Sequence, residues 1–475
     1  MRKATVSGIV RRQLAAKPQP QLQKEQKVLV SKRSHFSTTT ASVPNRYQQA
    51  CRVQMLGSFF WETKTDDLMA HLRKAEAGLM EYAKQFGNYS ADKVKMTIQE
   101  TSIPSELLPF QKQNVLKEDL QIHSLRVTSK GENDVTTTTT DTTKKHDTPL
   151  VILHGYMNGA LYFYRNVVGL SNYFNTVYSL DQPGCGLSTR APGLLANIDN
   201  TVEATEEFFV ESLEAWRKAQ GVDKMILAGH SMGGYISVAY CERYPERVEQ
   251  LILLSPVGVP KEDEEKTQAF VSRMSWTRRS VVNSVRYLFD FGVTPAGFSR
   301  KLPSSRSRNM IESYVKGRLP VITDPQEQQT VTDYLYYLAM IPGFGEDMLN
   351  RFLKSNAHAR QPTVDRIPKL QVPKVSFLYG DRDWMDIQGG LQVYEQCKLQ
   401  KNDNDNNKNN SNNSSSSSSK GPDIEVYQLQ EAGHLLMVDN WRGMNAGVVA
   451  MCGGMSTLSP HYPMPMLVRS TLVAI

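Results

Sequence analysis

A serine stands between two glycines in the pentapeptide Gly229-His230-Ser231-Met232-Gly233. An apolar run precedes it and a helix-like pattern follows it, which places the serine at a sharp turn between a strand and a helix. Glycines suit such a turn because they lack the Cβ atoms that would clash there. A serine hydroxyl is a weak nucleophile, so it needs a base and an acid that orients the base. The pattern predicts nucleophilic catalysis by Ser231.

The base is expected late in the chain, after one of the last strands. The segment "EAGHLLMVDN" supplies His434, directly after an apolar run at 424–430. Other histidines fit this role less well, since His35 lies in a basic N-terminal segment and His146 in a Thr-rich stretch. We therefore predict that His434 takes the proton of Ser231.

The orienting acid is expected after the preceding strand, where "YGDRDWMD" offers Asp381, Asp383 and Asp386. The G-x-x-D spacing after the strand favours Asp383, and Asp386 remains the alternative. Acids that are not needed for catalysis would cap the helix expected from about residue 387.

Negative charge that develops on an acyl oxygen needs two backbone N–H donors. Met232, directly after the serine, is predicted to supply one. The other is expected from "HGYMNGALYFY", where we choose Tyr156, with Met157 as the alternative, and expect His154 to organise the loop. This chemistry requires no metal and no organic cofactor.

The elements around these residues alternate between strands and helices. Apolar, β-branched runs predict parallel strands at 150–155, 176–181, 224–230, 250–256, 374–380 and 424–430. Helical spacing predicts helices at 66–87 and 202–221, and two further runs, 93–100 and 119–127, predict an antiparallel opening hairpin. This alternation predicts an α/β fold with a mostly parallel, doubly wound sheet.

The domain organisation follows from the point where the alternation of strands and helices stops. Residues 257–370 are helix-rich without strand-like runs, so we expect a helical cap between a first core part at 60–256 and a second at 371–475. The low-complexity stretches 127–149 and 401–422 are expected to be surface loops or disordered.

Positive charge is concentrated at the N-terminus. The first 46 residues hold ten Lys/Arg and one acid, and this local excess of positive charge is larger than the net charge of +7 of all 475 residues. The rest of the chain is therefore not basic, and its charge gives no support to nucleic-acid binding. Residues 1–45 are Arg-rich, acid-poor and rich in hydroxyl residues, so we expect a mitochondrial transit peptide; a disordered basic tail is the alternative. Five scattered cysteines without CxxC argue against a disulfide or zinc framework.

Three segments together carry a resemblance to a known family: 208–260, 373–386 and 431–440. The chain resembles α/β-hydrolases, specifically the lipid-acting subfamily of N-acyl-phospholipid lysophospholipases, lysophosphatidic acid acyltransferases and mitochondrial cardiolipin deacylases. With the predicted presequence, the resemblance implies hydrolysis of acyl esters in cardiolipin or another anionic mitochondrial phospholipid. Some relatives carry Asn in place of the nucleophile and act as non-catalytic lipase coactivators, whereas this chain keeps Ser231.

Acyl transfer to lysophosphatidic acid from acyl-coenzyme A is the alternative implied by the resemblance. The subfamily shares an H-x4-D motif that is associated with this activity, and His434 and Asp439 match it. The competing interpretation is that Asp439 caps the next helix.

A membrane contact is expected on the cap. No stretch reaches the ~18–20 consecutive apolar residues that span a bilayer, so any contact must be peripheral. The segment 273–318 holds ten Lys/Arg against Asp290 and Glu312, interleaved with aromatic residues. We expect it to face anionic lipid; packing of the aromatics on the core is the alternative.

Overall fold

The computed structural model describes a large part of the chain. The described residues are 58–87, 94–108, 119–129, 146–190, 198–290, 292–343, 345–410, 421–454 and 466–467. The predicted presequence, residues 1–45, and most of the low-complexity stretch 127–149 lie outside them.

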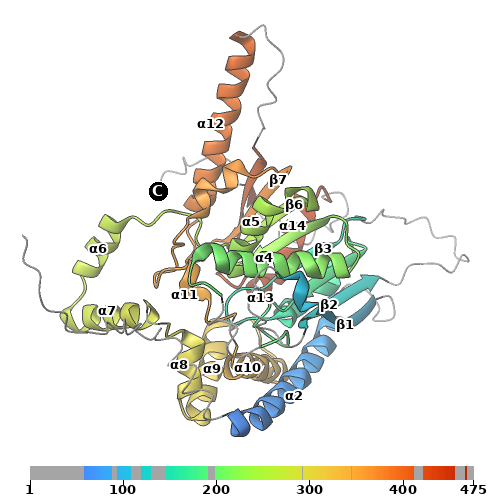
Figure 1. Cartoon of the computed structure of the whole chain (residues 1–475), viewed down its shortest axis with the longest axis vertical. Helices are drawn as coiled ribbons and strands as arrows, with labels where there is room; N and C mark the ends of the chain where they lie inside the picture. The colour runs from blue at the N-terminus through green and yellow to red at the C-terminus, as the bar shows by residue number, and fades with distance from the viewer. Residues whose placement is uncertain are drawn as a thin grey trace, which may run out of the picture. The chain divides into compact units, whose positions relative to one another are not determined.

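The strands form one nine-stranded sheet with the order β1-β2-β4-β3-β5-β6-β7-β8-β9. Figure 1 shows this sheet with helices around it. Strands β3 to β8 run parallel to their neighbours, whereas β1, β2 and β9 pair antiparallel. The strands are β1 (Val94–Ile103), β2 (Leu120–Ser129), β3 (Leu150–Leu153), β4 (Thr176–Leu180), β5 (Met225–His230), β6 (Val248–Leu254), β7 (Lys374–Gly380), β8 (Asp423–Leu429) and β9 (Met466–Leu467). The predicted α/β fold with a mostly parallel sheet is confirmed.

Helices follow most strands. The α-helices are α2 (Ser58–Ala83), α3 (Tyr164–Leu170), α4 (Val202–Ala219), α5 (Met232–Arg243), α6 (Glu264–Ser272), α7 (Trp276–Asp290), α8 (Pro295–Lys301), α9 (Ser304–Arg318), α10 (Pro325–Met340), α11 (Leu349–Phe352), α12 (Gln388–Asn410), α13 (Leu436–Asp439) and α14 (Trp441–Met451). Short 3-10 helices are η1 (Lys84–Phe86), η3 (Ser105–Leu107), η5 (Ala160–Phe163), η7 (Pro245–Arg247), η8 (Thr363–Asp365) and η9 (Ile367–Lys369).

The central strands are buried on both faces, which explains why their sequences are unbroken apolar runs. In β5, Met225 and Leu227 pack into the core layer that contains α4 and α5. Ile226 and Ala228 point the other way, into the layer that contains α2, α3 and α14. Burying a side chain of the size of Leu227 contributes roughly 1.5–3 kcal/mol, so both layers hold the sheet in register.

The α-helices α6 to α11 and the 3-10 helices η8 and η9 lie between β6 and β7 in the chain. Among them α10 packs against α9 and against the leading helix α2, as Figure 1 shows. Tyr334 and Leu338 of α10 are buried in the same core layer as Leu72 of α2. This packing fixes one side of the helical segment on the sheet domain.

One part of the second low-complexity stretch differs from the prediction. Helix α12 continues to Asn410, so residues 401–410 are helical rather than a loop. The first half of α12 is anchored by the buried residues Leu391 and Val393, and the polar continuation propagates from that anchor. Residues 411–420 lie outside the described residues.

No helix among the described residues has both the length and the apolar character that a bilayer span requires.

Candidate active site

Ser231 occupies the turn between β5 and α5, at the C-terminal edge of the sheet. Its backbone has φ 52° and ψ −115°, a conformation that is strained for a residue with a Cβ. A Cβ on Gly233 would lie 2.5 Å from the carbonyl oxygen of Leu153, and one on Gly229 would collide with the carbonyl of Gly233. Both glycines are therefore required for close backbone packing, and the turn holds the serine at the edge of the sheet.

His434 reaches this serine from the loop after β8. Its Nε2 lies 3.1 Å from the Oγ of Ser231, and its side chain is mostly buried. The loop is held against the turn at Ser231 because the Nε2–H of His230 donates a hydrogen bond of 2.8 Å to the carbonyl oxygen of His434. The structure thus brings the predicted nucleophile and base within hydrogen-bond distance.

Asp383 completes the arrangement from the loop after β7. Its Oδ1 lies 3.1 Å from the Nδ1 of His434 and also accepts a hydrogen bond from the Met385 amide. The alternative, Asp386, accepts from the Gln388 amide at the start of α12, so it serves as a helix cap. Asp381 accepts from the amide of Ala432 and so ties two loops together.

The environment keeps Asp383 ionised. Burial alone would raise the pKa of this carboxyl group, but the hydrogen bond and the charge of His434 hold the pKa below its ordinary value. An ionised carboxylate at Nδ1 fixes the tautomer in which Nε2 can accept the proton of Ser231.

His230 is wholly buried and remains neutral. Burial, followed by repulsion from His434, lowers the pKa of His230 to about 3. A neutral His230 with its proton on Nε2 can donate to the backbone of His434, as the geometry requires. In the sequence, His230 is only one residue of the pentapeptide around Ser231. Its hydrogen bond to the loop of His434 could not be inferred from that motif.

Asp439 ends α13 and directly precedes Asn440, but its side chain turns back to the loop that carries His434. Its Oδ2 accepts a hydrogen bond of 2.9 Å from the Gly433 amide and lies 3.5 Å from Nη1 of Arg318, at the end of α9. The helix cap of α14 is Asn440, whose side chain accepts from the Gly443 amide. The capping role considered for Asp439 is therefore wrong, and this side chain instead connects the His434 loop to α9.

Tyr156 and Met232, the predicted sources of the two amide donors, both line the cavity at Ser231. Their amides donate to no group among the described residues. Met157, the alternative donor, has a positive φ of 54° and lies in the same turn. His154 organises this turn, since it contacts the carbonyl oxygen of Gly155 and its Nε2 accepts from the Gln182 amide.

A cavity of about 450 Å³ opens at Ser231, and apolar groups form most of its surface. Much of the lining comes from α9, α10 and α11, which sequence analysis assigned to a cap without naming pocket residues. These residues are Met310, Ile311, Tyr314, Leu335 and Leu349. At the mouth, the exposed ring of Trp384 lies against His434 with ring centroids 4.9 Å apart. An apolar cavity with a few polar groups at one end is typical of a site for a largely apolar ligand.

Residues 148–440 match the family described as the alpha/beta hydrolase fold. The chain is 28% identical over 338 residues to a probable 1-acylglycerol-3-phosphate O-acyltransferase of Oryza sativa, covering 70% of this chain and 73% of that protein. It is 28% identical over 281 residues to a mouse (lyso)-N-acylphosphatidylethanolamine lipase, covering 58% and 75%. A human protein named 1-acylglycerol-3-phosphate O-acyltransferase ABHD5 is 31% identical over 252 residues, covering 52% and 67%.

Proposed function

The chain belongs to the alpha/beta hydrolase family, and we propose that it is a serine hydrolase that removes an acyl chain from a phospholipid. The observation that carries the proposal is the continuous hydrogen-bonded series from Ser231 through His434 to Asp383 at the edge of an apolar cavity. The lipid-acting relatives support the same class of substrate.

In the proposed mechanism, His434 Nε2 takes the hydroxyl proton while Oγ of Ser231 attacks the ester carbonyl carbon. Asp383 stabilises the imidazolium that forms. The amides of Tyr156 and Met232 donate to the negatively charged oxygen of the tetrahedral intermediate. The intermediate collapses to an acyl-enzyme, and the lysolipid alkoxide leaves with the proton from His434. Water, deprotonated by the same histidine, then releases the fatty acid.

Cardiolipin or a related anionic mitochondrial lipid is the proposed substrate. This choice rests on the predicted transit peptide at residues 1–45 together with the resemblance to cardiolipin deacylases. We accordingly place the protein at a mitochondrial membrane, as a peripheral component.

Helix α7 is the proposed membrane contact. Its Trp276 is 80% exposed and its Leu288 47% exposed. Arg278, which is exposed, and Arg286, which is half-buried, form no ion pair with a described residue. Exposed apolar and cationic side chains on one helix match a bilayer surface that carries anionic head groups.

The positive charge of the cap is not all available for this contact. Arg300 is mostly buried and pairs with Glu346 and Asp347, at 3.1 and 3.3 Å. Arg308 pairs with Asp333, and Arg318 with Asp439. The proposed contact is therefore narrower than the whole basic stretch 273–318 that the sequence suggested.

Acyl transfer is the second candidate, because the rice and human relatives carry acyltransferase names. In that reaction a lysolipid hydroxyl replaces water in the second half, with acyl-coenzyme A as the acyl donor. Asp439, the second residue of the H-x4-D motif, binds the Gly433 amide, so we assign it a positioning role for His434. A non-catalytic adaptor is disfavoured because Ser231, His434 and Asp383 are all present with hydrogen-bond geometry.

The proposal is tested by incubating purified protein with a panel of mitochondrial phospholipids, with and without acyl-coenzyme A. Fatty-acid release from cardiolipin without acyl-coenzyme A supports the hydrolase. Product that forms only with acyl-coenzyme A and a lysolipid supports the transferase. No turnover under either condition would favour the adaptor.

A further inference from the structure

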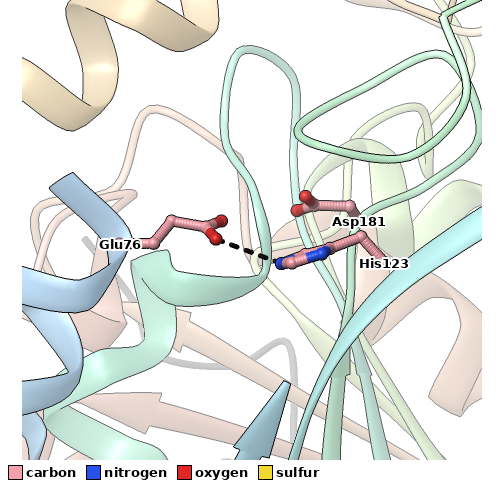
Figure 2. Close-up of side chains that lie close together, drawn as sticks. All are labelled: Glu76, His123 and Asp181. Atoms are coloured by element: carbon pink, nitrogen blue, oxygen red, sulfur yellow. Dashed lines mark hydrogen bonds and ion pairs between the residues drawn. The ribbon is translucent and has the colours of Figure 1, made fainter. Parts of the chain in front are cut away.

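Three buried side chains that the mechanism does not use meet between α2, β2 and the end of β4. They are Glu76 of α2, His123 of β2 and Asp181, which follows β4 (Figure 2). One ligand-type atom from each residue lies within 4.8 Å of the others, and Glu76 Oε2 lies 3.1 Å from the Nε2 of His123. All three residues are at least 97% buried.

Protein contacts satisfy this group only in part. Both oxygens of Asp181 accept backbone hydrogen bonds, from Ala160 at 2.6 Å and from Leu187 at 2.7 Å. The second oxygen of Glu76, Oε1, is buried and has no hydrogen-bond partner among the described residues. Figure 2 shows the Glu76 carboxylate pointing toward His123 and Asp181. A buried carboxylate oxygen without a partner is costly, so its position calls for a positively charged or donating group that would satisfy it.

The other ring nitrogen of His123 contacts a carboxylate, as is common for histidines that bind a metal through their first ring nitrogen. Nδ1 of His123 lies 2.7 Å from Oε1 of Glu100, on the neighbouring strand β1. A carboxylate that accepts the Nδ1–H fixes the tautomer with a free lone pair on Nε2 and increases its basicity. Nε2 lies 3.1 Å from Oε2 of Glu76, and this contact is a hydrogen bond while the imidazole is protonated, so an ion would have to take the place of the Nε2 proton.

We propose that Glu76, His123 and Asp181 bind one divalent transition-metal ion, such as Zn²⁺ or Mn²⁺. One imidazole nitrogen and two carboxylates are ligands that both ions accept. Donors about 2.1 Å from an ion lie at most about 4.2 Å apart, so binding draws the ligand atoms together by several tenths of an ångström. Motif analysis could not find this site because its ligands are separated by about fifty residues each.

The position of the site gives the ion a structural role. Asp181 holds the amide of Ala160, which follows the turn that carries Tyr156. Glu76 belongs to the leading helix. An ion shared by the two carboxylates would fasten α2 to the segment that supports the predicted oxyanion donor. This inference does not depend on the proposed reaction.

The test measures metal binding by the full, untagged chain. After treatment with chelator, the protein is titrated with Mn²⁺ and followed by electron paramagnetic resonance, and bound Zn²⁺ is counted by mass spectrometry after dialysis. We expect one ion per chain and a rise in the unfolding midpoint. Glu76→Gln and His123→Gln should each weaken binding at least tenfold, because each removes one ligand.

The matched control is Glu249→Gln, which alters an exposed carboxylate that also faces a histidine, His146, at 3.4 Å. It should bind the metal like the parent. If Glu76→Gln or His123→Gln fails to fold, titration of the parent still shows whether the chain binds one metal ion. Absence of stoichiometric binding by the parent at 100 μM metal, or equal binding by a folded Glu76→Gln variant, would overturn the proposal. Loss of lipid hydrolysis with intact metal binding would count against the proposed function alone.

Discussion

The Nδ1 of His434 lies 3.1 Å from Oδ1 of Asp383, and Asp383 is fully buried where it meets the imidazole. Asp386 is only three residues further along the chain, yet its carboxylate binds the first amide of α12. The two acids that the sequence leaves in competition therefore have different neighbours, and this difference makes their roles separable.

Asp383→Asn should lower kcat by about 10⁴-fold, because an amide at this position favours the wrong tautomer of His434. Asp386→Asn should stay within a few-fold of the parent, since Asn also caps helices. Hydrolysis of a soluble short-chain ester measures both. The reverse ranking would assign the orienting role to Asp386.

His230 should make folding stability depend on pH. The unfolded chain takes up a proton near the ordinary pKa of 6.5, whereas the folded protein does so only near 3. The contribution is therefore fully present above pH 6.5 and is lost as the pH falls toward 3, by about 2 kcal/mol between pH 7.5 and 5.0. Asn does not titrate, so between pH 7.5 and 5.0 the His230→Asn variant should lose about 2 kcal/mol less stability than the parent.

Urea unfolding of parent and His230→Asn at the two pH values measures this difference, since the other titrating groups are common to both proteins. Equal losses of stability would show that His230 is protonated in the folded state.

The order of strands within the sheet was not predicted. What could be predicted from the sequence is the order of strands along the chain and the strand ends at which the chemically active residues lie. Parallel strands buried on both faces give apolar runs, and Ser231, Asp383 and His434 each follow such a run, at 225–230, 374–380 and 423–429. Their placement at one edge of the sheet follows from that order. The G-x-x-D spacing favours Asp383, which does lie at His434, but it does not exclude Asp386, because the choice between two nearby acids depends on loop conformation.

Long-range contacts between side chains could not be predicted either. Asp439 and Arg318 are separated by 121 residues, and Glu76 and His123 by 47. The residues of α9 and α10 that line the cavity, such as Ile311 and Leu335, have the same spacing as ordinary core positions. A single sequence does not distinguish a pocket wall from a core.

Neutralising α7 should weaken membrane binding without affecting catalysis at the serine. The triple variant Arg278→Gln, Arg279→Gln and Arg286→Gln should bind cardiolipin-containing vesicles less tightly by about 3 kcal/mol at most at low salt, since each cation near an anionic surface contributes roughly 1 kcal/mol. High salt should reduce the difference by screening. Co-sedimentation measures binding, and the rate on a soluble ester should stay unchanged.

A matched triple variant neutralises exposed cations elsewhere: Arg73, Lys95 and Lys224. It should retain most of the binding. If both triple variants lose affinity equally, overall charge rather than α7 accounts for the contact.

Deleting residues 1–45 should leave the ester hydrolysis rate unchanged, because the described fold begins after them. The truncated protein should remain in the cytosol, whereas the full chain should enter mitochondria. Cell fractionation of both forms measures this. Mitochondrial import of the truncated chain would contradict the predicted transit peptide.

The central claim is that Ser231 is the nucleophile, and labelling by a fluorophosphonate probe tests it most directly. The parent should be labelled and should release fatty acid from phospholipid. Ser231→Ala, which keeps the fold by circular dichroism, should lose the label, and its hydrolysis should fall by several orders of magnitude. A folded Ser231→Ala variant that is still labelled, or that hydrolyses phospholipid at the parent rate, would contradict the account.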